Sequence, residues 1–586
     1  MCGIFGVIPD KNKSAAETIL KGLQKLEYRG YDSWGIAIKS EKQNKLLIEK
    51  HIGKIGGAHT ILPKSSIGIG HTRWATHGGV TDANAHPHLD CTEKIAVLHN
   101  GIVENYQELK DILKQKKHIF RSETDTEVIA HLIEEKLKTS TFFEAVTDTF
   151  NELVGSNAIA VLDYQSESII VCRNGSPLVL GIGKNEYFFA SDVTAFLNKT
   201  NRVIFLSDGE GALLEKTKYK IFNIKTKKEI TSKIQKLNWK IEDAEKGGYP
   251  HFLLKEIMEQ KISIPRAFVS NKVAISNLAQ MIKNNHKIIM IGCGSAYHCG
   301  LAAKYLFSES GIQSEVYGSY EFAPFLKNVN NKTLLFAISQ SGETADTLIV
   351  TKLAKKQGAT IVAIVNAKGS TLERLADYVF SVGAGPEIAV VSTKAFTAQL
   401  ATLSLLAKTL ENETNDFELV KKSLNQWLTN NQHNKILAIA KNLVDHEHIY
   451  VIGKYLNFPA ALEFALKLKE TSYIHAEAFA SGELKHGVLA LIQKGTPCFV
   501  LTANDSIRGE VLSSAAEMKA RGAITIGVGP QNAKEFDYFI ETPNTPPFIS
   551  IFFNIIVGQL LGYYLGIGRG ADPDKPRNLA KSVTVK

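Results

Sequence analysis

The first third of the chain alternates short runs of β-branched and aromatic residues with turns rich in polar residues and glycine. Such runs predict short β-strands. Two amphipathic patterns, at residues 14–26 and 126–137, predict helices, and residues 122–125 before the second are rich in helix-capping types. Together these patterns predict an α+β fold of layered sheets. The predicted strands span residues 3–8, 35–39, 67–72, 95–100, 158–163 and 168–173.

The rest of the chain follows another pattern, in which an apolar strand, a glycine-rich turn and a helix recur. This order is typical of an α/β domain with a doubly wound parallel sheet. Residues 287–293 resemble 448–454, and residues 333–340 resemble 497–503, in each case about 160 residues further on. The sequence therefore predicts two copies of one α/β domain.

Breaks in these patterns indicate where the domains meet. Residues 247–250 (GGYP) separate the layered region from the repeats, and residues 412–434 form a polar connection between the two copies. We predict domains at 1–240, 241–430 and 431–571, followed by a tail at 572–586.

Composition narrows the class of protein. The chain has 586 residues, more than one hydrophobic core usually supports, and 44% of them are hydrophobic. Its net charge of +9 is mild for this length, and the lysine-rich run 216–240 predicts a solvated surface and not a nucleic-acid partner. Residues 548–568 are long and apolar enough to span a bilayer, but three polar residues and four glycines interrupt the run. We expect a buried core helix there and no membrane partner.

The six cysteines, at positions 2, 91, 172, 293, 299 and 498, are scattered without a C-x-x-C motif. Their spacing argues against disulfides and against a zinc site, and it favours a reducing, cytoplasmic location. The first eight residues lack the charged segment of a signal peptide. We expect neither a metal ion nor another cofactor.

Cys2 is the first candidate for chemistry. A small residue in second position allows removal of the initiator methionine, which leaves Cys2 at the terminus. Its thiol is then a strong nucleophile, and its own α-amine, with a pKa of roughly 7.7–8.0, can act as the general base. The alternative is an ordinary buried thiol at the start of a strand.

Polar clusters follow the predicted strands of the same region. Arg73 lies in HTRWATHG, Asn100 and Gly101 end a strand, and Asp125 opens a helix. A guanidinium can bind a carboxylate, an aspartate can bind an ammonium, and an amide with a glycine N–H can face an oxyanion. These groups match the functional groups of glutamine. Each cluster alone could instead be a surface pair or a turn.

The segments MCGIFG, EYRGYDSWG, GHTRWATHG, NAHPH, HNGIVENY and SETDTE, in this order, resemble the glutaminase domain of the N-terminal-nucleophile (Ntn) amidotransferases. The resemblance implies that Cys2 forms a γ-glutamyl thioester and that Asn100 and Gly101 form the oxyanion hole. It also implies a glutamine-binding set of Arg73, Trp74, Thr76, His77 and Asp125, with Trp74 gating the passage of ammonia.

In the first α/β repeat, the turn after residue 338 carries Ser339, Gln340, Ser341 and Thr344 before a helix. Hydroxyls and free N–H groups at a helix N-terminus favour a phosphate. The second repeat has Thr502 to Asp505 there, and an aspartate would repel phosphate. An ordinary hydroxyl cap is the alternative. Loops containing Ser295 and Ser392 also follow strands, where open α/β sheets bind ligands.

In the second repeat, a predicted helix places Glu463, Lys467 and Glu470 on one face, because they are separated by four and three residues. The surrounding residues are apolar, so these groups are expected to enter a pocket, although a solvated salt-bridge ladder is the alternative. His486 lies on a glycine-flanked loop soon after, and Lys581 in the tail offers a carbonyl-reactive amine.

Both repeats resemble the sugar isomerase (SIS) domain. The whole chain resembles the glutamine:fructose-6-phosphate amidotransferase (isomerizing) family, the glucosamine-6-phosphate synthases. The resemblance rests on ISQSGETADT, STKAFTAQL, ALEFALKLKE, SYIHAEAFASGELKHG and DPDKPRNLAKSVTV. It implies that the amide nitrogen of glutamine is transferred to fructose 6-phosphate, that the product is isomerised to glucosamine 6-phosphate, and that glutamate is released.

The same resemblance implies the residue roles. The sugar phosphate binds Ser339, Gln340, Ser341 and Thr344, with Ser295, Ser392, Glu463 and Lys467 nearby. Lys581 condenses with the C2 ketone, Glu470 moves a proton between C1 and C2, and His486, supplied by a neighbouring subunit, opens the ring. A homodimer is therefore expected.

Three departures from the family pattern are Trp34, Ala296 and residues 154–158. Two alternatives stay open: an amidotransferase with a different acceptor, and a non-catalytic sugar-phosphate sensor. Lys581, Glu470 and His486 argue against the sensor, since binding alone needs none of them.

Overall fold

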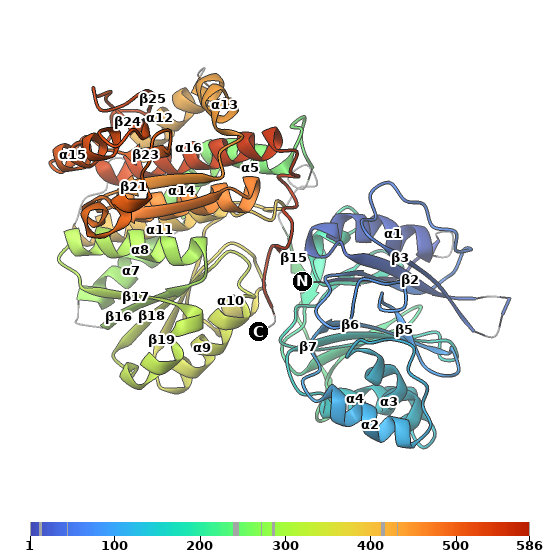
Figure 1. Ribbon diagram of the computed structural model, residues 1–586. Helices are drawn as coiled ribbons and strands as arrows, with labels where there is room; N and C mark the ends of the chain where they lie inside the picture. The colour runs from blue at the N-terminus through green and yellow to red at the C-terminus, as the bar shows by residue number, and fades with distance from the viewer. Residues whose placement is uncertain are drawn as a thin grey trace. The chain divides into compact units, whose positions relative to one another are not determined.

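The computed structural model describes residues 2–10, 14–40, 42–43, 45–237, 245–270, 272–283, 287–411, 417–429 and 432–584. The chain divides into two compact units (Figure 1). Unit 1 comprises Met1–Asp243 together with Ala580–Lys586, and unit 2 comprises Ala244–Leu579.

Unit 1 contains two antiparallel sheets. The first has the order β15-β11-β9-β10-β1-β4-β2-β3, with β1 (Gly3–Ile8), β2 (Ser33–Lys39), β3 (Leu46–Ile52), β4 (Gly68–Arg73), β9 (Val179–Ile182), β10 (Tyr187–Ala190), β11 (Arg202–Phe205) and β15 (Gln235–Lys236). The second has the order β14-β13-β12-β8-β7-β6-β5, with β5 (His88–Leu89), β6 (Ile95–Gly101), β7 (Asn157–Asp163), β8 (Ile169–Asn174), β12 (Glu210–Leu214), β13 (Tyr219–Asn223) and β14 (Glu229–Ile230).

The two sheets of unit 1 stack face to face between helices (Figure 1). Helix α1 (Ala15–Leu26) covers the first sheet, and α2 (Tyr106–Gln115), α3 (Glu127–Leu137) and α4 (Phe142–Glu152) cover the second. Alternate apolar residues of both sheets, such as Ile4, Ile69 and Leu98, fill the space between them. The predicted α+β layered fold is confirmed, and each of the six predicted strands forms.

Unit 2 contains two five-stranded parallel sheets with the same strand order. One is β17-β16-β18-β19-β20, with β16 (Lys287–Gly292), β17 (Ser314–Gly318), β18 (Thr333–Ser339), β19 (Thr360–Val365) and β20 (Tyr378–Ser381). The other is β22-β21-β23-β24-β25, with β21 (His448–Gly453), β22 (His475–Ala480), β23 (Pro497–Leu501), β24 (Ile524–Gly529) and β25 (Tyr538–Glu541). Strands β16 and β21, and β18 and β23, are the pairs that the sequence repeat predicts.

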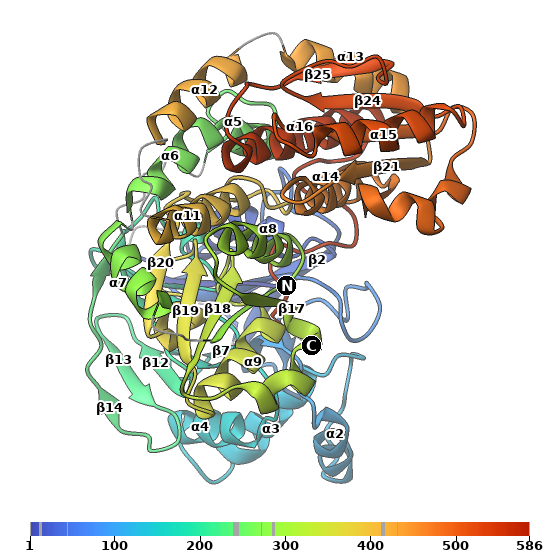
Figure 2. The same ribbon diagram turned by 90° about the vertical axis from the view of Figure 1, so that its left-hand side faces the viewer.

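The helices of unit 2 lie on the faces of these sheets (Figure 2). One large core joins the two sheets through the helices packed between them. Those with a central role are α8 (Ser295–Glu309), α11 (Lys394–Leu410), α14 (Asn457–Ser472) and α16 (Pro547–Gly568). The others are α5 (Phe252–Met258), α6 (Gln260–Ser270), α7 (Lys272–Lys283), α9 (Ala345–Lys356), α10 (Thr371–Leu375), α12 (Phe417–Thr429), α13 (Gln432–Leu443) and α15 (Arg508–Lys519).

Helix α16 is the one helix in the described part of the chain that is long and apolar enough to cross a membrane, and 94% of its most apolar window is buried inside the protein. Its Gly558, Gly562 and Gly566 recur every four residues and face α14. A Cβ atom on Gly562 would lie 2.8 Å from Thr471 Oγ1 and 3.0 Å from Lys467 O. The glycines therefore let the backbones of α14 and α16 approach closely, and this contact fixes the position of α14.

We predict that Gly562→Ala lowers the free energy of unfolding by about 1–3 kcal/mol, because the added methyl group must displace the backbone of α14. Urea unfolding of the purified chain measures this change. Gly509→Ala is the matched control, since Gly509 is also helical but has no atom within 4 Å of an added Cβ. The control is expected to be neutral or slightly stabilising. Equal stability of the two variants would show that α14 and α16 do not depend on this close contact.

Candidate functional site

Cys2 lies immediately before β1, beside the end of β4. Gly3 pairs with Thr72 in the sheet, and the Gly3 N–H donates to Thr72 Oγ1 at 3.1 Å. The Trp74 N–H donates to Cys2 Sγ at 3.2 Å. Burial raises the pKa of the Cys2 thiol, although the Trp74 N–H and the charge of Arg73 act in the opposite direction. The thiol is therefore protonated at rest, and a nucleophilic attack requires a base.

Asn100 and Gly101, at the end of β6, are brought next to Cys2. Asn100 Nδ2 donates to the carbonyl oxygen of Cys2 at 3.0 Å, and His71 Nε2 lies 3.0 Å from Asn100 Oδ1. Gly101 has φ +142°, and a Cβ atom there would lie 2.1 Å from Ser156 O. The amide of Asn100 thus points its donor toward Cys2, and only glycine fits at the next position.

The glutamine-binding candidates surround the same position. The guanidinium of Arg73 donates to the carbonyl oxygens of Gly79, at 3.0 Å, and Gly78, at 3.2 Å. Asp125 Oδ2 accepts the Val103 N–H at 2.7 Å. The charges of Arg73 and Asp125 both influence the Cys2 thiol, so these groups lie near it.

The remaining three candidates lie on the loop that follows Arg73. Trp74 is half-buried and meets the ring of Tyr31 edge-on, with 5.5 Å between centroids. His77 is half-buried against Tyr106, with 5.6 Å between centroids, and Thr76 is exposed. This loop is the more accessible side of the candidate site.

In unit 2, the predicted phosphate turn joins β18 to α9. Ser339 Oγ lies 3.1 Å from Thr344 Oγ1 and accepts the Gly342 N–H at 3.0 Å. Ser341 Oγ accepts the Glu343 N–H at 3.2 Å. The carboxylate of Glu343 is turned away and accepts the N–H and hydroxyl of Thr371, at 2.6 and 2.8 Å. The Glu343 carboxylate is thus bound to Thr371, and hydroxyl and N–H groups line the turn where a phosphate could bind.

The three charged residues of α14 form a buried ionic group. Lys467 Nζ lies 3.2 Å from Glu463 Oε1 and 2.6 Å from Glu470 Oε2. The side chain of Glu463 is 0% exposed, that of Lys467 1% and that of Glu470 21%. A fully solvated salt-bridge ladder is therefore excluded. Only Glu470, at the end of the row, remains in partial contact with solvent.

Residues from the first repeat complete this group. Ser295 Oγ donates to Glu463 Oε1 at 2.9 Å, and His298 Nδ1 lies 2.9 Å from Glu463 Oε2. Lys467 Nζ also donates to Ser392 O at 3.1 Å. Burial raises the pKa of Glu463, but Lys467 and His298 outweigh it, so the net pKa lies below its usual value. Burial likewise opposes the charge of Lys467, yet the two carboxylates raise its pKa above the usual value.

His486 and Lys581 lie outside helix α14. His486 ends the short 3₁₀ helix Ser481–His486 and is exposed. Lys581 falls in the segment Ala580–Lys586, which belongs to unit 1. The tail before it is anchored in unit 2, where the Arg577 N–H donates to Tyr473 OH at 2.9 Å and the guanidinium lies 4.2 Å from the centre of the Tyr473 ring.

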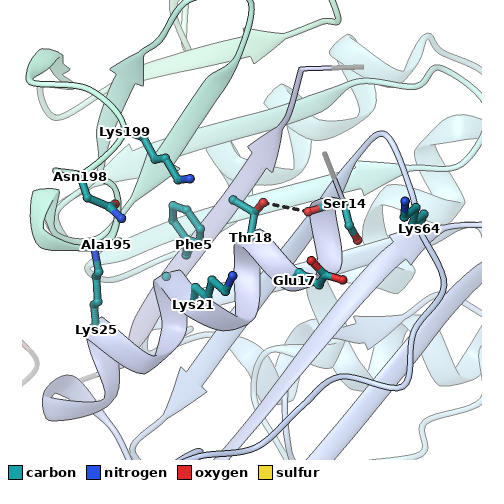
Figure 3. A pocket seen from close by; sticks show the side chains of 11 residues that line it. Phe5, Ser14, Glu17, Thr18, Lys21, Lys25, Lys64, Ala195, Asn198 and Lys199 are labelled. Atoms are coloured by element: carbon teal, nitrogen blue, oxygen red, sulfur yellow. Dashed lines mark hydrogen bonds between the residues drawn. The ribbon is translucent and has the colours of Figure 1, made fainter. Parts of the chain in front are cut away.

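Unit 1 also contains a cavity of about 520 Å³ between α1 and the loop at residues 195–199 (Figure 3). Phe5 lies between Lys21 and Lys199, and Lys25, Lys64 and Glu17 also line the cavity. None of the candidate site residues lines this cavity, so it is separate from the site around Cys2.

Comparison with known proteins identifies the domains of both units. A family described as the glutamine amidotransferase domain matches residues 71–198, and the SIS domain family matches residues 281–409 and 442–565. The glutamine–fructose-6-phosphate aminotransferase (isomerizing) of Thermococcus kodakarensis is 45% identical over 610 residues, with 100% of each chain covered. The enzyme of the same name from Pyrococcus horikoshii is 44% identical over 605 residues, again with 100% of each chain covered.

The chain belongs to the glutamine–fructose-6-phosphate aminotransferase (isomerizing) family.

A solved structure of a family member supports the fold of unit 2. The C-terminal domain of the glucosamine-fructose-6-phosphate aminotransferase from Francisella tularensis has a TM-score of 0.52 and 33% sequence identity. The match covers 56% of this chain and 99% of that domain. The predicted pair of SIS domains is thereby confirmed.

Sequence reasoning missed the residues that hold the candidate site in place. His71 orients Asn100, and His298 holds Glu463. Glu387 accepts the Ser392 hydroxyl at 3.2 Å and the Thr393 and Ala395 N–H groups at 2.9 and 3.0 Å, so it fixes the loop that carries Ser392. His71 lies inside the GHTRWATHG segment, but its role depends on contacts with residues far along the chain.

Four histidines of unit 1 are buried, and burial lowers their pKa values. Burial lowers the pKa of His71 to about 3 and also lowers the pKa of His86, His88 and His99. In the unfolded chain a histidine has a pKa of about 6.5. Between these values the unfolded state binds more protons than the native state, so acidification favours unfolding.

We predict that these histidines hardly affect the free energy of unfolding above about pH 6.5. At lower pH the free energy of unfolding should decrease by up to about 1.4 kcal/mol per pH unit for each histidine. Urea unfolding at a series of pH values measures the slope. His88→Gln should reduce it, whereas His59→Gln should not, because His59 is exposed in the folded chain. A slope that is unchanged in His88→Gln would contradict the prediction.

Proposed function

We propose that this chain transfers the amide nitrogen of glutamine to fructose 6-phosphate, isomerises the product to glucosamine 6-phosphate, and releases glutamate. The proposal rests on one observation: the chain has two chemically different sites. One places an amide donor beside a thiol, and the other buries a lysine between two carboxylates. Full-length relatives carry the name of this reaction.

In the first half-reaction, Cys2 Sγ attacks the amide carbon of glutamine. The α-amine of Cys2 takes the thiol proton and returns it to the leaving nitrogen, so that ammonia departs and a γ-glutamyl thioester remains. Water then hydrolyses the thioester to glutamate. Asn100 Nδ2 and the Gly101 N–H stabilise the oxyanion, a role supported by the 3.0 Å contact between Asn100 Nδ2 and Cys2 O.

We assign recognition of glutamine to the groups around the thiol. Arg73 binds the α-carboxylate, which exchanges with some of the loop carbonyl oxygens that Arg73 now contacts. Asp125 binds the α-ammonium. Thr76 and His77 close the loop over the substrate. We assign the gating of ammonia release to Trp74, whose backbone N–H contacts Cys2 Sγ.

In the second half-reaction, the turn formed by Ser339, Gln340, Ser341 and Thr344 binds the 6-phosphate at the N-terminus of α9. Ser295 and Ser392 contact the sugar. Lys581 condenses with the C2 ketone and loses water, and ammonia then displaces the lysine to give an imine at C2. Glu470 removes a proton from C1 and delivers it to C2, which produces the amino aldose.

Burial and charge support the roles on α14. Glu470 is the only member of the ionic group that keeps contact with solvent, with 21% of its side chain exposed, so it is the member that can reach a substrate. Glu463 and Lys467 hold it in position. The tail is anchored on Tyr473, at the C-terminal end of α14. Lys581 follows Arg577 by four positions, so the chain keeps the two residues within about 14 Å of each other.

The proposal also covers the assembly, the passage of ammonia, the location and the domain limits. The exposed position of His486 fits a residue that acts in a neighbouring subunit, so we propose a homodimer. Ammonia passes between the two sites through an internal channel. All six cysteines are free thiols, which supports a reducing, cytoplasmic location and a place in amino-sugar biosynthesis. We further propose domain limits at residues 240, 430 and 571.

Variants of the two sites should separate the two half-reactions. Cys2→Ala should abolish glutamine hydrolysis but leave isomerisation of fructose 6-phosphate, because Cys2 takes no part in proton transfer on the sugar. Glu470→Gln should do the reverse and slow isomerisation by roughly 10²–10⁴-fold, since it removes the general base. Glutamate release and hexose-phosphate conversion are assayed on the same preparations.

Each variant serves as the folding control for the other, because each is expected to keep one full activity. Loss of both activities in Cys2→Ala, at an unchanged melting temperature, would contradict two separable sites. Ligand binding without either activity in the unmodified chain would instead favour a sugar-phosphate sensor.

A further inference from the structure

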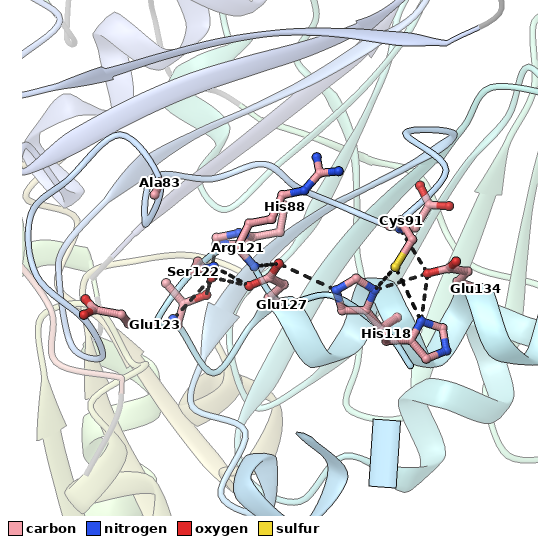
Figure 4. Close-up of polar contacts among 12 residues, drawn as sticks. Ala83, His88, Cys91, His118, Arg121, Ser122, Glu123, Glu127 and Glu134 are labelled. Carbon is pink, nitrogen blue, oxygen red and sulfur yellow. Dashed lines mark hydrogen bonds and ion pairs between the residues drawn. The ribbon is translucent and has the colours of Figure 1, made fainter. Parts of the chain in front are cut away.

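Four potential metal ligands converge in unit 1, away from Cys2 (Figure 4). Cys91 lies in the turn between β5 and β6, His118 follows α2, and His131 and Glu134 lie one turn apart on α3. One thiol, two imidazoles and one carboxylate are the ligand types that zinc takes in proteins. The proposed amidotransfer uses none of these four side chains.

Four of the six distances between the ligand atoms are close to those of a tetrahedral zinc site, and all four atoms lie within 4.8 Å of one another. Cys91 Sγ lies 3.7 Å from His118 Nδ1 and 3.5 Å from His131 Nδ1. Glu134 Oε2 lies 3.0 Å from His118 Nδ1 and 3.1 Å from His131 Nδ1. In a tetrahedral zinc site, standard bond lengths place sulfur and nitrogen ligands about 3.5 Å apart and nitrogen and oxygen ligands about 3.3 Å apart.

Both histidines present their second ring nitrogen to another carboxylate. His118 Nε2 lies 3.1 Å from Glu135 Oε2, and His131 Nε2 lies 3.6 Å from Glu127 Oε1. Glu127 is itself held by the N–H groups of Arg121 and Ser122, each at 2.7 Å. A carboxylate behind a metal-bound histidine fixes the orientation of the ring and increases its basicity.

The two imidazole rings are buried: the side chains of His118 and His131 are only 4% and 1% exposed. Glu134 Oε2 also accepts the Cys91 N–H at 3.0 Å, so the β5–β6 turn holds this carboxylate beside both Nδ1 atoms. A divalent cation among these atoms would have its charge cancelled by a Cys91 thiolate and the Glu134 carboxylate.

We propose that Cys91 Sγ, His118 Nδ1, His131 Nδ1 and Glu134 Oε2 form a structural zinc site. The protein fills all four positions, which is typical of structural and not of catalytic zinc. The ion would join the β5–β6 turn, the end of α2 and helix α3, which hydrogen bonds to Glu134 already link. Cys91 and Glu134 are half-buried, so an ion can enter from solvent.

The test is the zinc content of the full chain after dialysis against a weak chelator, measured by mass spectrometry. The unmodified protein should retain about one zinc ion per chain, because a preformed four-ligand site binds tightly. Cys91→Ala and Glu134→Gln should each lower the retained zinc at least tenfold. Cys2→Ala and Cys172→Ala are the matched controls: they remove a half-buried and a buried thiol of the same unit, and should retain the ion.

Two measurements on the unmodified chain cover the case in which a variant does not fold. Adding zinc to the metal-free protein should raise its melting temperature by several degrees. Cobalt in place of zinc should give the absorption band of a thiolate-bound tetrahedral ion. Absence of both effects, or zinc that is lost in Cys2→Ala and kept in Cys91→Ala, would overturn the proposal.

Discussion

Both candidate sites depend on one constraint: a polar or charged group that is removed from water must find its partners inside the protein. In unit 1, His71 and the carbonyl of Cys2 hold the amide of Asn100 from its two ends. In unit 2, Lys467 is held between Glu463 and Glu470, and His298 Nδ1 contacts the other carboxylate oxygen of Glu463. Removing one partner of such a group leaves the other uncompensated. The side chains proposed to act on the substrates are therefore fixed before a substrate arrives.

The elements of the fold could largely be predicted because their burial pattern is local. Strand β1 was predicted at its observed limits, and the repeat of β16 in β21 predicted the duplicated parallel sheets. The helices α2 and α4 were missed. Both helices are amphipathic, but α2 buries only Leu109 and Leu113, and α4 carries several β-branched and aromatic residues, which are also typical of strands. The short edge strands, such as β14, follow from pairing with a neighbour and not from their own sequence.

The candidate site was predictable only in part, for a different reason. Motifs identify the residues that would touch substrates, but they do not identify the partners that orient them. Asn100 contacts Cys2 across 98 positions, and Ser295 contacts Glu463 across 168. The four proposed zinc ligands could not be predicted from the sequence for the same reason. They have no recognisable spacing in the sequence, since Cys91 and Glu134 are 43 positions apart, and only the fold brings them together.

The central claim is that nitrogen released at Cys2 becomes the amino group of the sugar. The most direct test supplies glutamine with a heavy-nitrogen amide, fructose 6-phosphate and an excess of unlabelled ammonium, and follows the products by mass spectrometry. The account predicts glucosamine 6-phosphate that carries the heavy nitrogen, formed in an amount equal to glutamate. Glutamate formed without labelled amino sugar would contradict it.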